Sequence, residues 1–181
     1  MSDLFWPGDH RADDLMSDEA LLRALIEVEN AWLTALVSNG VAPAEAAADL
    51  RPLVGADDLT AIAVDAEADG NPVSGLVSLL RSRTGDTAAR WLHRGLTSQD
   101  TLDTALMMCV RDVLRRVEDH VRTQVRALQA LIEAHRDAPL LTRTLTQPAL
   151  PSTAGRKFGV WLTAILDAAD TLDASRRFPS R

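Results

Sequence analysis

The feature that most constrains the fold is the stretch of residues 100–137, which contains neither glycine nor proline. Apolar side chains recur in it at steps of three or four residues, the spacing of one helix face. They are Leu102, Leu106, Cys109, Val113, Val117, Val121, Val125, Leu128 and Ile132. With a rise of 1.5 Å per residue, the stretch predicts one helix roughly 55 Å long. An amphipathic helix of that length needs partner helices, as in a long bundle.

The residues before this stretch predict a smaller helical domain. Residues 1–16 are mixed and polar, and we expect an irregular arm there. Ser17 is a suitable N-cap for a first helix, and Asn39-Gly40 is a suitable stop. Four short helical segments follow, at about 43–53, 57–66, 72–83 and 86–91. No segment in this part alternates with the period of two that marks a half-buried strand.

The residues after the stretch predict a second long helix. Pro139 ends the first one, because proline cannot continue a helix. We expect an irregular connection through LLTRTLTQPALPST and a helix that starts near Ser152 or Thr153. The sequence therefore predicts an all-α fold. Residues 1–99 form an N-terminal helical domain, and residues 100–181 form the first two long helices of an incomplete bundle.

Composition excludes several classes of function. The net charge is −7 and the basic residues are scattered among acids, so no basic stripe favours nucleic acid. The single cysteine, Cys109, excludes an intrachain disulfide and is expected in the core. No secretory signal and no membrane-length apolar run occurs, which favours a cytoplasmic protein. The four histidines lack metal-ligand spacing, so we expect no metal, and no nucleotide or serine-hydrolase motif occurs.

A polar segment, HRGLTSQD at residues 93–100, stands where the long helix begins. A helix N-terminus attracts anions, since its unpaired N–H groups and the positive end of its dipole point the same way. Thr97 and Ser98 would add hydroxyl groups, and His93 could carry a proton. A substrate carboxylate is the expected ligand. The alternative interpretation is that Ser98 or Asp100 merely caps the helix.

Two further segments carry weaker signals. Residues 142–153, TRTLTQPALPST, gather hydroxyl groups, an amide and a guanidinium between the two long helices. Such a connection either brings polar groups towards a pocket or forms a solvated corner. Gly70-Asn71-Pro72-Val73 enters a short helix, and an ordinary helix start is the simpler interpretation of it.

Taken in this order, the segments GNPV, HRGLTSQDTLDT and RTLTQPALPSTAGRK resemble the signature regions of the fumarase/aspartase superfamily. The resemblance extends from residue 4 to about residue 172 and includes the opening LFWPGDHRADD segment. It implies a central bundle of long helices, a homotetramer, and active sites that each combine three subunits. It also implies a small polycarboxylate substrate and no cofactor.

Within the superfamily, the sequence most resembles the muconate cycloisomerase branch, which forms a lactone in aromatic compound degradation. Other branches, such as adenylosuccinate lyase, usually have a histidine where this chain has Leu145. Carried over residue by residue, the resemblance implies catalytic roles for His93 and Ser98. It implies substrate-binding roles for a second group of residues, namely Thr97, Thr144, Gln147, Asn71 and Lys157.

The resemblance also predicts what these residues lack. The superfamily has a third signature region, a mobile loop reading roughly GSSxMPxKxNP with a serine as general base, and no such string occurs here. We therefore expect a chain cut before its catalytic loop and of poor activity alone. Two alternatives remain: another lyase of the superfamily, such as adenylosuccinate lyase, and a non-catalytic helical assembly partner.

Overall fold

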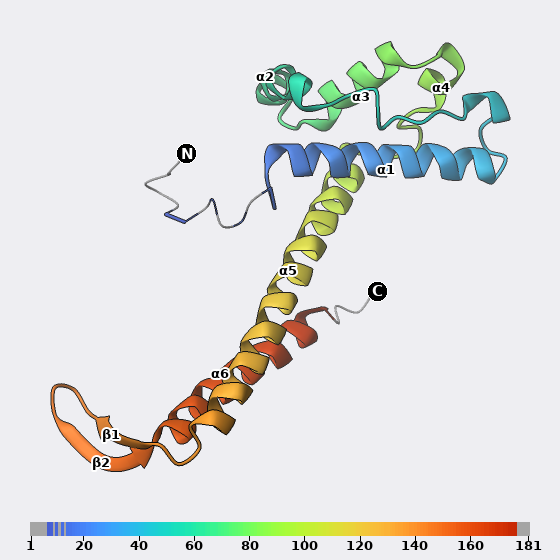
Figure 1. Cartoon of the computed structure of the whole chain (residues 1–181). Coiled ribbons are helices and arrows are strands. Elements are labelled where there is room, and N and C mark those ends of the chain that lie inside the picture. The colour runs from blue at the N-terminus through green and yellow to red at the C-terminus, as the bar shows by residue number, and fades with distance from the viewer. Residues whose placement is uncertain (1–6, 9, 11, 13, 177–181) are drawn as a thin grey trace. The chain divides into compact units, whose positions relative to one another are not determined.

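The computed structural model describes residues 7–8, 10, 12 and 14–176 (Figure 1). The predicted arm at residues 1–16 therefore lies mostly outside the described residues. The described part is helical apart from one two-stranded sheet, which confirms the predicted fold class. The chain divides into two compact units, Met1–Val113 and Leu114–Arg181. None of the described helices has an apolar stretch long enough to cross a membrane.

The first unit is built on helix α1, Asp18–Ser38. The Ser17 hydroxyl accepts a hydrogen bond from the Ala20 N–H, which confirms Ser17 as the N-cap. Asp18 and Glu19 place negative charge in the first turn, where the helix dipole favours it. Gly40 follows the helix with φ of +69°, a conformation that glycine adopts without a steric penalty.

The remaining elements of this unit are short. They are two 3-10 turns, Ala44–Ala46 and Ala56–Asp58, and the helices α2, Leu59–Asp69, α3, Val73–Arg83, and α4, Asp86–Trp91. The helix predicted at 43–53 was wrong, because only the turn Ala44–Ala46 forms. The Leu50 N–H donates instead to the buried Asn30 Oδ1 of α1, and this bond ties the segment to α1 in an extended form.

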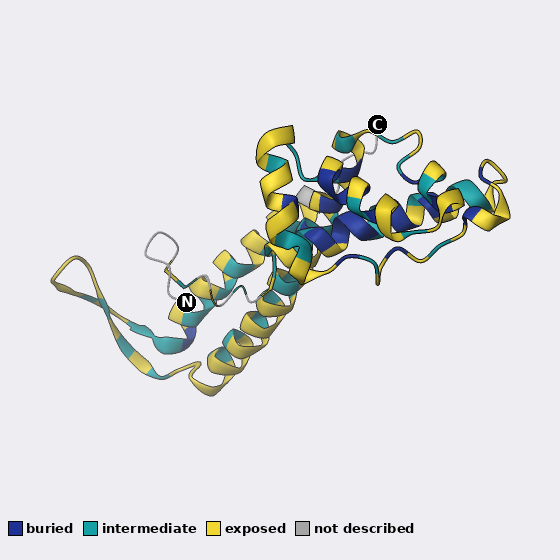
Figure 2. Cartoon of the chain, turned by 90° about the horizontal axis from the view of Figure 1, so that it is seen from above, coloured by how far each residue is buried: buried dark blue, intermediate teal, exposed yellow. Residues whose placement is uncertain are grey.

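The core of the first unit lies where α1 faces α3 and the loops beside them, shown in dark blue in Figure 2. Its largest fully buried apolar side chains are Leu25, Leu33, Leu50, Leu76, Leu80 and Leu92. Burying one leucine contributes roughly 1.5–3 kcal/mol, so this face accounts for much of the unit's stability. One charged residue lies on the same face of α1: Glu29, which is 0% exposed.

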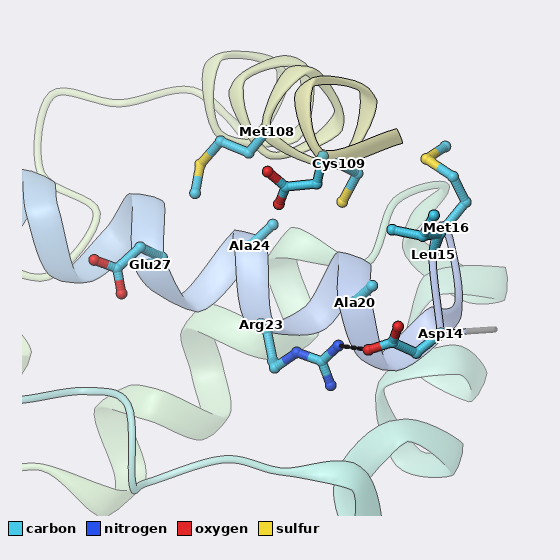
Figure 3. A pocket seen from close by; sticks show the side chains of 10 residues that line it. Asp14, Leu15, Met16, Ala20, Arg23, Ala24, Glu27, Met108 and Cys109 are labelled. Atoms are coloured by element: carbon cyan, nitrogen blue, oxygen red, sulfur yellow. Dashed lines mark hydrogen bonds and ion pairs between the residues drawn. The ribbon is translucent and has the colours of Figure 1, made fainter. Parts of the chain in front are cut away.

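The predicted long helix is confirmed as α5, Ser98–Ala134. Its first turns belong to the first unit, where Thr101, Ala105 and Cys109 are buried. Cys109 faces α1 across a hollow that Met108, Ala20 and Ala24 also line (Figure 3). Burial raises the pKa of the Cys109 thiol, and the nearby Asp112 carboxylate adds to the effect. The expectation that Cys109 is a core residue is confirmed.

The second unit contains a hairpin that the sequence did not predict. Strands β1, Pro139–Arg143, and β2, Pro148–Thr153, pair in antiparallel fashion between α5 and helix α6, Ala154–Arg176. The irregular connection expected here was therefore wrong. Prolines obscured the strand pattern, because proline donates no ladder hydrogen bond. A two-stranded sheet accommodates them, since every strand in it has a free edge.

Helix α6 lies beside the later turns of α5 in the second unit (Figure 1). A hollow between them is lined mainly by apolar side chains, among them Leu128 and Leu131 of α5 and Trp161 and Ile165 of α6. Several large apolar side chains of this unit stay exposed. They include Leu131, Val160, Trp161 and Leu166.

Gly155 fixes how closely α6 approaches the end of α5. Its N–H donates to the His135 carbonyl over 2.9 Å, and the Ala154 N–H donates to the Ala138 carbonyl over 2.9 Å. A Cβ atom on Gly155 would lie 2.7 Å from both the Cα and the carbonyl oxygen of Arg136. Backbone atoms cannot move aside as a flexible side chain does, so only glycine fits this contact.

Replacing Gly155 by alanine should destabilise the second unit by roughly 1–3 kcal/mol, the usual cost of overpacking. The matched control is Gly159→Ala, because a Cβ at Gly159 meets no atom within 4 Å. In a helix interior this control should stabilise by about 0.5–1 kcal/mol. Urea unfolding followed by circular dichroism measures both changes. Equal midpoints for the two variants would contradict the argument.

Candidate active site

The loop between α4 and α5 is anchored on both sides. The Arg81 guanidinium donates to the Leu92 carbonyl over 2.9 Å, and the Trp32 indole N–H donates to the Arg94 carbonyl over 2.9 Å. Between these anchors His93 has φ of +60°, and Gly95 has φ of +82°. A left-handed conformation costs a histidine free energy, so the surrounding contacts must hold His93 in place.

The His93 ring contacts a carboxylate inside the first unit. Its Nδ1 atom lies 2.6 Å from Oε1 of Glu29, and the His93 side chain is 17% exposed. The Thr101 hydroxyl donates to the same Oε1 atom over 3.1 Å. The other carboxylate oxygen, Oε2 of Glu29, is buried without a hydrogen-bond partner among the described residues. Three separate elements, α1, the loop and α5, therefore meet at one carboxylate.

The start of α5 is closed by a capping box. The Thr97 N–H and hydroxyl both donate to Oδ2 of Asp100, over 2.9 and 2.7 Å, and the Asp100 N–H donates back to the Thr97 hydroxyl. These hydrogen bonds hold the pKa of Asp100 below its usual value, and the nearby His93 adds to the effect. Asp100 therefore caps the helix, as the alternative interpretation of this segment predicted, and Thr97 is its reciprocal partner.

Ser98 is in the first turn of α5 and is half-buried. Its hydroxyl makes no hydrogen bond to any residue that the structure describes. The N–H groups of Ser98 and Gln99 come too early in α5 to find a carbonyl within the helix. The N-terminus of α5 thus keeps donor groups next to the His93 loop, an arrangement suited to a carboxylate.

Asn71 has a structural role in the first unit. Its side-chain oxygen accepts a hydrogen bond from the Val73 N–H over 3.0 Å and thereby starts α3. No hydrogen bond or ion pair joins Asn71 to the His93 loop in the described part of the chain. The interpretation of GNPV as an ordinary helix start thus has direct support, whereas substrate binding by Asn71 stays a prediction.

The other predicted binding residues belong to the second unit. The Thr144 N–H donates to the Gln147 carbonyl over 3.0 Å and closes the hairpin turn, in which Leu145 is 91% exposed. Lys157, in the first turn of α6, lies 5.3 Å from the centre of the Trp161 ring. Lys157 also lines a hollow together with Arg143 and Arg156, so three cationic side chains line that hollow.

The structure thus brings the predicted residues together in two groups. His93, Thr97 and Ser98 lie in one loop and helix start, while Thr144 and Gln147 close one hairpin turn. The two groups belong to different compact units, and a site that combines them stays a prediction. No cluster of three metal-binding side chains occurs among the described residues.

Sequence reasoning missed the two residues that hold His93, Glu29 and Thr101. The signal was present for Glu29. It follows Leu22, Leu25 and Ile26 at helical spacing and precedes Leu33 by four residues, so it is a charged residue on an apolar stripe. A carboxylate in that position is expensive to bury without partners, which is itself a sign of a polar site.

The comparison with known families defines the class of protein. The lyase family matches residues 12–178, and the chain belongs to that family within the fumarase/aspartase superfamily. Members of this superfamily are enzymes, namely lyases and cycloisomerases. The predicted superfamily is therefore confirmed.

Several curated relatives are similar to the chain. Nitrosuccinate lyase of Streptomyces davaonensis is 37% identical over 84% of this chain and 33% of its own length. The 3-carboxy-cis,cis-muconate cycloisomerase of Acinetobacter baylyi is 32% identical over 94% of this chain and 39% of its own length. Adenylosuccinate lyase of Methanothermobacter thermautotrophicus is 32% identical over 86% of this chain and 35% of its own length.

Solved structures agree with the fold. Fumarate lyase from Mesorhizobium sp. BNC1 has a TM-score of 0.81 at 34% identity, covering 91% of this chain and 39% of that one. The 3-carboxy-cis,cis-muconate lactonizing enzyme from Pseudomonas putida has a TM-score of 0.84 at 30% identity, with the same coverage. The chain spans 33–39% of the length of the curated relatives named above. Because different lyases match similarly well, the comparisons do not single out the cycloisomerase branch.

The capping box predicts an acid-sensitive contribution to stability. The folded-state pKa of Asp100 is lowered, so its contribution is complete above the unfolded pKa of about 3.9 and disappears as pH falls through the folded value. Asp100→Asn should therefore lower Tm near neutral pH and change it progressively less in acid. Thermal unfolding from about pH 7 to pH 2 measures this difference. A difference that stays constant down to the lowest pH would refute it.

Proposed function

We propose that the chain contributes the substrate-docking part of an enzyme that acts on a small polycarboxylate, in the manner of 3-carboxy-cis,cis-muconate cycloisomerase. The observation that carries the proposal is the placement of His93. Its ring is held by the buried Glu29 carboxylate directly before the N-terminus of α5. A proton carrier thus stands beside a site that favours anions.

The proposed reaction is an intramolecular addition. A carboxylate oxygen of the muconate bonds to one carbon of a double bond, and the π electrons move to the neighbouring carbon. That carbon lies next to a second carboxylate, which takes up part of the negative charge. A proton added to that carbon completes the lactone and replaces the one that the attacking carboxyl group had lost, so the acid forms of substrate and product are isomers. Fixed hydrogen-bond donors lower the barrier when they point to where the charge develops.

Each residue has a role in this proposal. His93 handles the proton, and the Ser98 hydroxyl and the first N–H groups of α5 hold a carboxylate. Thr97 contributes through the helix start that it completes, since its own hydroxyl proton points to Asp100. The second unit adds the hairpin turn from Thr144 to Gln147 and the Lys157 ammonium group. Asn71 is the weakest member of the set.

We propose that the hairpin turn and the His93 loop come from different copies of the chain. A homo-oligomer, a tetramer by analogy with the superfamily, would also cover the exposed apolar side chains of the second unit. A cytoplasmic location and the absence of a cofactor belong to the same proposal.

Association should depend on the exposed face of α6. Val160 is 64% exposed there, so Val160→Lys should leave the fold of the chain intact. It should reduce association, because a lysine buried in the interface between two copies would lose its hydration. Light scattering at micromolar concentration measures the mass. The control is Gln129→Lys, a polar exposed position on α5. A wild-type monomer would contradict the oligomer.

A second candidate is a nitrosuccinate lyase, favoured by the 37% identity to the Streptomyces davaonensis enzyme. Its substrate is a dicarboxylate, whereas 3-carboxy-cis,cis-muconate has three carboxylates. In this case a proton would leave the carbon next to one carboxylate, and the carbon–nitrogen bond would break to give an alkene and nitrite. Both reactions pass through negative charge beside a carboxylate, so the same site suits either one.

Adenylosuccinate is a third candidate substrate, because the relatives include an adenylosuccinate lyase. Against it, Leu145 stands where that branch usually has a histidine. A non-catalytic assembly partner would bind none of these ligands.

Ligand binding separates these candidates. Titration of the ¹⁵N-labelled chain with 3-carboxy-cis,cis-muconate should shift the amide signals of Ser98 and Gln99, and nitrosuccinate and adenylosuccinate are the competing ligands. Ser98→Ala should weaken binding about tenfold, the effect of about 1.4 kcal/mol from one hydrogen bond to a charged group. The matched control is Ser74→Ala, an exposed serine in the first turn of α3.

Turnover is measured in the same samples, by loss of diene absorbance for the muconate and by nitrite release for nitrosuccinate. We expect slow turnover by the chain alone, because these residues contain no GSSxMPxKxNP loop to supply a base. Rapid turnover would contradict that expectation. If none of the three ligands shifts the α5 signals, the proposed function is wrong.

A further inference from the structure

We infer that Glu29 is a positioning residue that fixes the tautomer and orientation of His93, so that Nε2 is the nitrogen that exchanges a proton with substrate. The inference about the role in catalysis rests on the proposed function, whereas the tautomer follows from the contacts alone. It concerns the one carboxylate that, among the described residues of the first unit, lies fully inside the core.

The first step is the direction of the hydrogen bond. An ionised carboxylate only accepts hydrogen bonds, so the 2.6 Å contact between Nδ1 of His93 and Oε1 of Glu29 requires a proton on Nδ1. In a neutral imidazole the other nitrogen then has no proton and accepts. Nε2 makes no hydrogen bond to any residue in the described part of the chain, so it is the nitrogen left for a ligand.

The second step concerns why the contact is rigid. Glu29 projects from the middle of α1, a helix packed against the core, and Thr101 holds the same oxygen from the first turn of α5. The backbone of His93 is left-handed, a conformation that persists only where neighbouring groups enforce it. The Trp32 bond to the Arg94 carbonyl and the Arg81 bond to the Leu92 carbonyl enforce it from either side.

The third step is the cost of the arrangement. Oε2 of Glu29 is buried without a partner, and leaving such an oxygen unsatisfied costs free energy. An apolar residue would pack in this core without that cost. A carboxylate here therefore contributes something other than core packing, and its partners among the residues that the structure describes are the His93 ring and the Thr101 hydroxyl. The pairing resembles a catalytic triad in logic, because a buried acid orients the imidazole that reacts.

The test is to record the tautomer directly. Long-range ¹H–¹⁵N spectra of the labelled chain, at about pH 9 where an ordinary imidazole is neutral, report which ring nitrogen of His93 carries the proton. We expect the proton on Nδ1. A proton on Nε2 in the wild-type chain would overturn the inference, whatever the variants do. His120, an exposed histidine on α5, serves as the reference in the same spectrum.

The variant is Glu29→Leu. It suits the surrounding leucines, and the Thr101 hydroxyl retains the Thr97 carbonyl as an acceptor at 3.4 Å. Without the carboxylate, His93 should move towards the tautomer mixture of a free imidazole. The matched control, Thr101→Val, removes the other donor to Glu29 and should leave the Nδ1 proton in place. An unchanged tautomer in a folded Glu29→Leu variant would also overturn the inference.

Titration with 3-carboxy-cis,cis-muconate then tests the two proposals separately. A shift of the Nε2 signal with little change at Nδ1 supports both of them. An Nδ1 proton in a chain that binds none of the three ligands leaves the tautomer assignment intact and removes the proposed function. An Nε2 proton in a chain that does bind muconate overturns the tautomer assignment and leaves the proposed function intact.

Discussion

The candidate site depends on one buried contact, in which Glu29 accepts hydrogen bonds from His93 and Thr101. The contact joins helix α1 to the start of α5, which are more than 60 residues apart in sequence. Together with the hydrogen bonds from Trp32 and Arg81 to the backbone, it holds the loop between them. Since an unpaired carboxylate would be costly in this core, the fold and the candidate site are not independent. The same residues that stabilise the loop define the chemistry available at its surface.

Much of the fold was predictable because the signals were local. Helix α5 has no glycine or proline and has a regular apolar stripe, and α1 has a serine cap and an Asn-Gly stop, so the ends of both helices were predicted to within three residues. The hairpin was missed because its signal is not local. Pro148 and Pro151 suggest a loop, and only the pairing of the two strands across the turn, for example of Leu140 with Ser152, makes the segment a sheet. The helix expected at 43–53 does not form because the Leu50 N–H donates a hydrogen bond to Asn30 of α1, a contact that no local pattern contains.

The residues of the candidate site were predictable from the sequence, but the buried residues that hold them in place were not. His93, Thr97 and Ser98 are visible as a polar string before a helix. What holds them was hidden, because a contact between Glu29 and His93 depends on how two distant segments pack. The similar relatives include a cycloisomerase and two different lyases, so their names do not add to what the sequence says about the site.

The left-handed backbone at position 93 has a consequence for which sequences this loop can tolerate. Asparagine adopts such a conformation with a small penalty, whereas valine and isoleucine are disfavoured by their branched Cβ atoms. Natural variation at this position would therefore be filtered first by backbone geometry and only afterwards by acid–base chemistry. A relative without the proposed catalytic role of His93 would tolerate asparagine or glycine at this position and still keep the shape of the loop.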